Sequence, residues 1–340
     1  MRRNSHSSIL GVALIALTAT LTWAAPLRRA AHSFAPQALM KSSSASGLRA
    51  GERIWPVERP ALAPNIPVPL SVRFREQSGR GLMIRVWVNG VGEFNFAIDT
   101  GAGATLLSEH IAREARVAER GGATVRLGGL SGAGTASGRE GLPRSLAVGE
   151  SDNWLPARGR FIITDALPPG VDGVLDPTEA YWPLGYTIDL PRGELSAFDP
   201  RVTPLSHTDV PAGGAVVPWI FEAGSRRPFV MLNGIRLALL DTGSEFGLAL
   251  SEEAARDIRL INDGRGRSRE GVRDIAGGTI GARRVAPATV NIGSLVLRGV
   301  PTDLLASVHA GAPVLLGREA LQPFRLTFDP LNRLISIAPR

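Results

Sequence analysis

The tripeptide Asp-Thr-Gly occurs twice in this chain, in closely similar surroundings. Residues 96–108 read FAIDTGAGATLLS and residues 237–251 read LALLDTGSEFGLALS. In both places an apolar, strand-like run leads into the aspartate, which aims the carboxyl group towards the interior. A carboxylate buried alone is energetically costly. The sequence therefore predicts that Asp99 and Asp241 are partners in one site.

The residues around the two motifs follow the same order of parts. An Asn-Gly turn signal precedes each motif; a short helix that a serine can cap, a Gly-rich turn and a strand-like ending follow it. Asp189 lies 90 residues after Asp99, and Asp329 lies 88 residues after Asp241. An internal duplication explains this spacing better than coincidence. The paired segments are residues 89–90 and 233–234, 109–118 and 252–258, 128–138 and 275–285, and 172–198 and 312–337.

The composition favours a fold built from many short strands. The chain has 340 residues, 39 Gly and 25 Pro, and 44% of its residues are hydrophobic, which is enough for one large core or two lobes. Alternating apolar runs at residues 83–90, 94–101, 123–129 and 160–164 are separated by Gly, Asn-Gly and Pro. This pattern is typical of strands joined by tight turns. We therefore expect an all-β fold with little helix.

The N-terminal residues are expected to precede the folded part. Two arginines come before an apolar run at residues 9–23 and two alanines follow it, which is the order of a secretory signal and its cleavage site. We assign residues 1–25 to a signal peptide and residues 26–67, rich in Ala, Ser, Pro and Arg, to a disordered leader. The protein is then periplasmic or secreted. The alternative is an inner-membrane anchor formed by residues 9–25.

The composition argues against several other functions. The formal charge is +7, but the arginines are scattered, Lys41 is the only lysine and aromatic residues are 6%, so nucleic acid binding is not expected. The chain has no Cys, which excludes disulfides and thiol chemistry. The histidines are dispersed and no Ser lies in a Gly-x-Ser-x-Gly sequence, so metalloprotease and serine hydrolase chemistry lack residues. The Gly-rich residues 132–138 do not join a strand to a helix, as a phosphate-binding loop does.

The two motifs, the Gly-rich hairpin after each, and Leu-Leu-Gly at residues 315–317 before FRLTFD resemble the pepsin-type and retroviral-type aspartic proteases. The resemblance covers about residues 68–337 and is strongest to a bacterial, single-chain, internally duplicated retropepsin-like protein. It implies an all-β bilobal fold, with one lobe at residues 68–205, the other at residues 206–340, and a cleft between them. It also implies an aspartic endopeptidase that needs no metal or organic cofactor, acts on a peptide or protein and works as a monomer.

In this family a water molecule is held between two carboxyl groups that share one proton, because like charges about 3 Å apart cannot both ionise. The resemblance assigns this dyad to Asp99 and Asp241, one as base and one as acid, titrating as a pair. The threonines after them would link the two loops by hydrogen bonds, and the glycines would allow a close backbone approach and an unusual φ. The supporting residues are Thr100, Gly101, Thr242, Gly243 and Ser244, and the flap residues that would contact substrate are Gly132, Gly134, Gly277 and Gly278.

Two features depart from the family pattern. By spacing, Asp176 matches Gly317, where the family has a glycine that packs beneath the catalytic loop; Gly173 would take this place if the register shifted by three residues. Neither Gly-rich hairpin has the tyrosine of pepsin-like flaps, which retroviral-type flaps also lack. The alternative function is therefore a catalytically inactive, aspartic-protease-like module that binds peptides.

The two motifs also differ from each other at their fourth position, which is Ala102 in one and Ser244 in the other. In the family, a hydroxyl here can donate a hydrogen bond to the neighbouring carboxylate and lower its pKa. The resemblance therefore implies that Asp241 stays ionised more readily, while Asp99 holds the shared proton.

Overall fold

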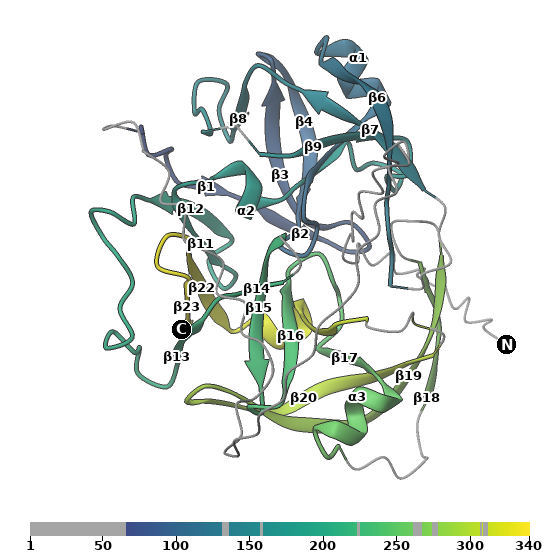
Figure 1. Ribbon diagram of the computed structural model, residues 1–340, viewed down its shortest axis with the longest axis vertical. Coiled ribbons are helices and arrows are strands. Elements are labelled where there is room, and N and C mark those ends of the chain that lie inside the picture. The colour runs from purple at the N-terminus through teal and green to yellow at the C-terminus, as the bar shows by residue number, and fades with distance from the viewer. Residues whose placement is uncertain are drawn as a thin grey trace, which may run out of the picture. The chain divides into compact units, whose positions relative to one another are not determined.

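The computed structural model describes residues 66–130, 136–156, 159–222, 225–260, 267–273, 278–306, 308 and 312–340. These residues are mostly β-strand with short helices (Figure 1), which confirms the all-β expectation. Ile66–Arg340 fall in one unit. The predicted signal peptide, the leader up to residue 65, and Gly132, Gly134 and Gly277 lie outside the described residues.

The first half of the chain forms one sheet, coloured purple to teal in Figure 1. Its strands are β2 (Arg75–Gln77), β3 (Gly81–Val88), β4 (Val91–Ile98), β5 (Thr105–Ser108), β6 (Ala118–Arg126), β7 (Ser137–Leu142), β8 (Leu146–Val148), β9 (Phe161–Thr164) and β10 (Gly173–Leu175). Their order is β2-β3-β4-β10-β5-β9-β7-β6, and β8 pairs with β3. The strand before Asp99, β4, runs parallel to β10, with Ile98 beside Leu175.

The second half forms a sheet of similar order. Its strands are β14 (Ile220–Glu222), β15 (Ser225–Leu232), β16 (Arg236–Asp241), β17 (Leu248–Ser251), β18 (Arg267–Arg273), β19 (Thr279–Ile292), β20 (Leu295–Ala306) and β21 (Val314–Gly317). Their order is β14-β15-β16-β21-β17-β20-β19-β18. The strand that ends at Asp241, β16, runs parallel to β21 with Asp241 beside Gly317.

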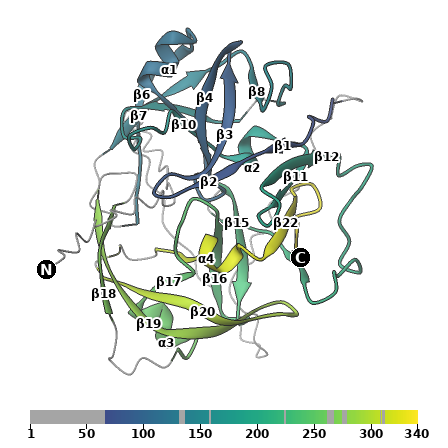
Figure 2. The same ribbon diagram turned by 180° about the vertical axis from the view of Figure 1, so that it is seen from behind.

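A third sheet takes strands from both halves (Figure 2). Its order is β1 (Val72–Arg73), β12 (Glu194–Phe198), β11 (Gly185–Asp189), β22 (Phe324–Asp329), β23 (Leu334–Pro339) and β13 (Ala215–Pro218). The central pair, β11 and β22, places Tyr186 opposite Phe328, and their rings stack with centroids 4.6 Å apart. Trp219 meets Phe328 edge-on at 5.8 Å. Such aromatic contacts stabilise the sheet beyond the burial of apolar surface. Because β11 comes from the first half and β22 from the second, their pairing joins the two halves of the chain.

The helices are short, and two of them begin as predicted. Their bounds are α1 (Glu109–Glu114), α2 (Pro177–Ala180), α3 (Glu252–Asp257) and α4 (Arg318–Leu321). Ser108 and Ser251 cap α1 and α3 by accepting backbone hydrogen bonds. The predicted helix at residues 109–118 is too long, because Arg116 adopts a left-handed φ of 50° and Ala118 already begins β6.

The two Asn-Gly turns also form as predicted. Asn89 and Gly90 have φ of 53° and 80°, and Asn233 and Gly234 have φ of 52° and 68°. A tight hairpin needs such left-handed residues, and Asn and Gly adopt them at low cost. The corresponding elements of the two halves therefore follow one order, whereas the duplication, the two lobes and their boundaries stay predictions.

Candidate active site

The two predicted aspartates are brought together in the interior. Asp99 directly follows β4 and Asp241 is the last residue of β16; their side chains are 2% and 0% exposed. The backbone of each aspartate is held in place by the neighbouring parallel strand. The amide of Asp99 donates to the carbonyl of Leu175 at 2.9 Å, and Asp241 is the register partner of Gly317.

The threonines of the two motifs hold the loops together. The amide of Thr100 donates to Oγ1 of Thr242 at 3.1 Å, and the amide of Thr242 donates to Oγ1 of Thr100 at 3.1 Å. The hydroxyls then donate across the site, from Thr100 to the carbonyl of Leu240 at 2.6 Å and from Thr242 to that of Ile98 at 3.2 Å. All four bonds are buried, where hydrogen bonds are electrostatically stronger than in water. The predicted link between the two loops is thus present and reciprocal.

The two glycines of the motifs leave space for the carboxyl groups. A Cβ atom on Gly101 would lie 2.8 Å from Cγ of Asp241, and one on Gly243 would lie 2.6 Å from Oδ1 of Asp99. Neither glycine has a left-handed φ, so the expected unusual φ is wrong. The close approach of each loop to the opposite carboxyl group is what requires glycine here.

The two carboxyl groups have unequal surroundings. Oδ1 of Asp99 accepts one backbone hydrogen bond, from Gly101 at 2.7 Å. Oδ1 of Asp241 accepts two, from Gly243 at 2.9 Å and from Ser244 at 3.1 Å. Because donors stabilise the charged form of an acid, the ionised state is better supported at Asp241.

This inequality indicates which carboxyl group holds the proton more readily. Burial, the charge of Asp241 and a hydrogen bond to it raise the pKa of Asp99 well above its ordinary range. Burial also raises the pKa of Asp241, but the hydrogen bond from Asp99, the two backbone donors and the charge of Arg318 oppose that rise. Oδ2 of Asp241 is buried and accepts no hydrogen bond from the described residues. We infer a singly protonated pair with the proton on Asp99.

The direction of this asymmetry agrees with the sequence-based expectation, but its source differs. The group of Ser244 that donates to Asp241 is the backbone amide, and the Ser244 hydroxyl accepts a hydrogen bond from the amide of Phe246 at 3.3 Å. The difference between Ala102 and Ser244 is therefore mainly one of loop geometry.

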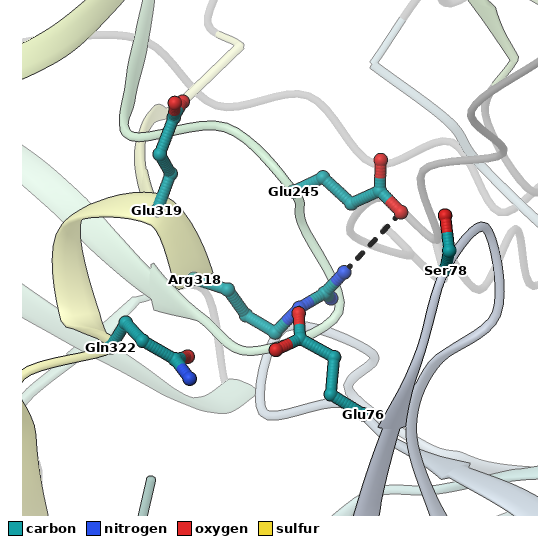
Figure 3. A pocket seen from close by; sticks show the side chains of 6 residues that line it. All are labelled: Glu76, Ser78, Glu245, Arg318, Glu319 and Gln322. Carbon is teal, nitrogen blue, oxygen red and sulfur yellow. Dashed lines mark hydrogen bonds and ion pairs between the residues drawn. The ribbon is translucent and has the colours of Figure 1, made fainter. Parts of the chain in front are cut away.

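Arg318, which sequence reasoning missed, supports the loop of Asp241. It begins α4 and is 3% exposed, and its Nη1 donates to the carbonyls of Thr242 at 2.8 Å and Gly243 at 3.1 Å. Glu76 accepts from its Nε at 3.2 Å, and Glu245 lies 3.5 Å from its Nη2. Figure 3 shows the guanidinium between these two glutamates. The one local signal was an arginine directly after Leu-Leu-Gly. A pocket of about 560 Å³ opens here, lined by Glu76, Ser78, Glu245, Arg318, Glu319 and Gln322.

The register settles the position of Asp176. Because Ile98 pairs with Leu175 and Leu240 pairs with Leu316, Asp176 takes the place beside Asp99 that Gly317 takes beside Asp241. Gly173 is the register partner of Phe96, so a shift by three residues does not occur. The carboxyl group of Asp176 instead accepts a hydrogen bond from the amide of Thr178 at 2.9 Å and caps α2.

The predicted flaps lie largely outside the described part of the chain. Gly278 is described, and it is buried directly before β19. The assignment of the flap residues to substrate contact stays a prediction.

The fold and the linked Asp-Thr-Gly loops define an acid-protease-like protein, and comparison with known families agrees. Residues 84–175 match the aspartyl protease family. This segment runs from β3 to the end of β10 and contains the first Asp-Thr-Gly motif. The match supports the resemblance of this segment to the pepsin and retropepsin-like aspartyl proteases, which the motifs predicted. No curated protein matches the chain significantly.

The buried carboxyl groups predict how stability depends on pH. Burial first, then the charge of Glu179, raises the pKa of Asp176 from an ordinary 3.8 to about 8, and the pKa values of Asp99 and Asp241 are raised as well. Between the ordinary and the raised value, the folded state binds protons that the unfolded state has released, so stability falls as pH rises. We expect Tm to be highest near pH 4 and to fall towards pH 8, because the free energy of unfolding decreases by up to about 1.4 kcal/mol per pH unit for each such group. Calorimetry across this range would contradict the prediction if Tm rose.

Arg318→Met is expected to alter both stability and acidity. Two buried carbonyls of the Asp241 loop lose their donor, which should reduce the free energy of unfolding by about 2 to 4 kcal/mol. Loss of the positive charge should raise the pKa of Asp241, so the acid limb of the kcat/KM profile moves to higher pH. Arg318→Lys keeps the charge and is the control: its acid limb should stay close to that of the wild type. Denaturant titration and pH profiles measure the two effects separately.

Proposed function

We propose that this protein is an exported aspartic endopeptidase in which Asp99 and Asp241 activate a water molecule to hydrolyse peptide bonds. The observation that carries the proposal is the pair of buried carboxyl groups on hydrogen-bonded Asp-Thr-Gly loops. Unequal donors around the pair supply one base and one acid from two chemically identical side chains. The family match supports the protease-like function, and the named residues and the activity are our proposal.

The roles follow from the inferred position of the proton. The ionised Asp241 takes a proton from the water molecule as the water oxygen attacks the carbonyl carbon of the peptide. Asp99 gives its proton to the carbonyl oxygen, and a tetrahedral diol forms. In the second step Asp241 gives its proton to the leaving amine as the carbon–nitrogen bond breaks. Asp99 takes a proton from one hydroxyl group of the diol as the carbonyl re-forms, so the dyad returns to its starting state.

A peptide-binding module without activity is the second candidate. The observations that favour it are the carboxyl group of Asp176 in place of glycine and the near-complete burial of the dyad, which a peptide must reach before hydrolysis. Such a module would bind peptides equally well with or without the two carboxylates.

A fluorogenic peptide library assayed between pH 3 and 8 tests the proposal against this alternative. Wild-type protein should cleave a subset of the peptides, and Asp241→Asn should not. An inhibitor with a hydroxyl group in place of the attacked carbonyl should bind the wild type far more tightly than the variant, because it mimics the transition state. Equal peptide binding by both proteins without cleavage would establish the binding module.

The proposal includes a location and an assembly state. Export to the periplasm or the medium is supported by the signal-like pattern of residues 1–25. In the described part of the chain no helix is long and apolar enough to cross a membrane. Because one chain supplies both carboxyl groups, the monomer is proposed as the active unit.

A further inference from the structure

Asp176 adds a third buried carboxyl group beside the dyad. It is 1% exposed and directly follows Leu175, whose carbonyl accepts the amide of Asp99 at 2.9 Å. Because Ile98 and Leu175 are register partners in parallel strands, the next residues of the two strands, Asp99 and Asp176, are neighbours. The proposed mechanism assigns Asp176 no step.

A side chain at this register position points towards the loop that follows the catalytic aspartate. In the second half, a Cβ atom on Gly317 would lie 2.8 Å from the carbonyl oxygen of Ser244 and 3.0 Å from its Cβ. In the first half the corresponding loop carries the small residues Ala102 and Ala104, both buried. The atoms that exclude a side chain at Gly317 belong mainly to the loop backbone, so the path of the loop decides whether this register position can hold a carboxyl group.

The groups around Asp176 both oppose and support its ionisation. Burial and the charge of Glu179 on α2 favour the neutral acid and give a pKa of about 8. The backbone amides of Thr178 and Glu179 favour the charged form, as expected for a residue that caps a helix. Among the described residues, the other titratable or charged groups that interact with it are Asp99 directly after β4, Tyr186 on β11 and Arg227 on β15.

The surroundings of Asp99 favour its protonated form more strongly than those of Asp176 do. It lies beside Asp241, which is ionised, and it accepts a single backbone hydrogen bond. At Asp176 the amides of Thr178 and Glu179 favour the ionised form, against the charge of Glu179. As pH rises, Asp176 therefore ionises first, and its new charge makes a second ionisation at Asp99 less favourable.

We propose that Asp176 is a positioning residue that keeps the shared proton on Asp99 as the pH rises, because it ionises first and repels a second charge. The inference rests on the proposed function, since the charge on Asp176 extends the pH range in which the dyad is singly protonated and active. Below this range Asp176 is neutral, so it leaves the acid limb of activity, which Asp241 sets, unchanged.

The test uses Asp176→Asn in the full-length chain. Asparagine is neutral at every pH, and its side-chain oxygen can still cap α2. We expect the alkaline limb of the kcat/KM profile to move to lower pH by about half a unit to one unit, while the acid limb stays in place. Asp176→Ser is a second neutral cap and should give the same shift. Asp329→Asn is the control, because Asp329 is equally buried but lies in the third sheet; neither limb should move.

A direct titration separates this inference from the proposed function. With ¹³C-labelled aspartate carboxyl groups, the Asp99 resonance is assigned by its loss in Asp99→Asn and its titration midpoint is followed in each variant. A midpoint lowered by half a unit or more in Asp176→Asn supports the inference even if no peptide is cleaved. An unchanged midpoint, or an unchanged alkaline limb in an active enzyme, would overturn it. If neither variant folds, the titration of the wild type tests the inference. The titration curve of the Asp99 resonance must then show a second inflection at the midpoint of Asp176, and the curve of Asp176 must show one at the midpoint of Asp99.

Discussion

Asp241→Asn and Asp99→Asn are each expected to reduce peptide hydrolysis by at least about 10³-fold, because one variant removes the base and the other the acid. The double variant should be little worse than either single variant, since the two groups act as a unit. The measurement is kcat/KM on the best peptide of a library, normalised to the fraction of folded protein. Near-normal turnover by either single variant would show that the dyad is not the catalytic centre.

A matched control is available in the same chain. Asp189 ends β11 and accepts a hydrogen bond from the backbone of Arg192 at 3.0 Å, away from the Asp-Thr-Gly loops. Asp189→Asn makes the same chemical change and should leave kcat/KM within about twofold of the wild type, as expected for a remote substitution. If it lowered activity as strongly as the dyad variants, the loss would reflect the fold and not the chemistry.

Gly243→Ala is expected to have the second-largest effect. The added Cβ atom would lie 2.6 Å from Oδ1 of Asp99, closer than real Cβ atoms approach a neighbour. Either the carboxyl group or the loop must move, and overpacking of a buried site costs about 1 to 3 kcal/mol. A displacement of about 1 Å in the dyad lowers catalysis by about 10²-fold. Thermal unfolding and kcat/KM measure the two losses.

Gly281→Ala provides the comparison for this prediction. Gly281 lies in β19 without a left-handed φ, and among the described residues its added Cβ would meet only the Cβ of Ala306, at 3.6 Å. This is an ordinary contact, so stability and activity should change little. Equal losses in both variants would mean that the space beside Asp99 is not the reason for glycine at residue 243.

The sequence alone was sufficient for features that depend on neighbouring residues. Strand alternation predicted the all-β fold, the Asn-Gly pairs predicted the hairpins, and serines marked the start of α1 and α3. These features could be predicted because a backbone conformation or a cap is decided within a few residues. The end of α1 was placed too late, since the pattern gave no sign that Arg116 would adopt a left-handed φ.

The repeated Asp-Thr-Gly motif also identified the two aspartates and the threonines that join their loops. It did so because both copies carry the same chemical groups in the same order. The motif could not show why its glycines are needed. The reason is the carboxyl group of the opposite loop, and the two loops lie 142 residues apart along the chain, measured between Thr100 and Thr242.

The sequence implied the direction of the asymmetry between the two aspartates, but only the tertiary structure showed its source and the neighbours of Asp176. The answer depends on the backbone amide of Ser244, the guanidinium of Arg318, which is 76 residues from Thr242, and the parallel pairing of β4 with β10. Electrostatic energies depend on distance and burial in space. Residue order along the chain carries neither quantity, so the sequence determined the identity of the dyad and the fold determined its acidity.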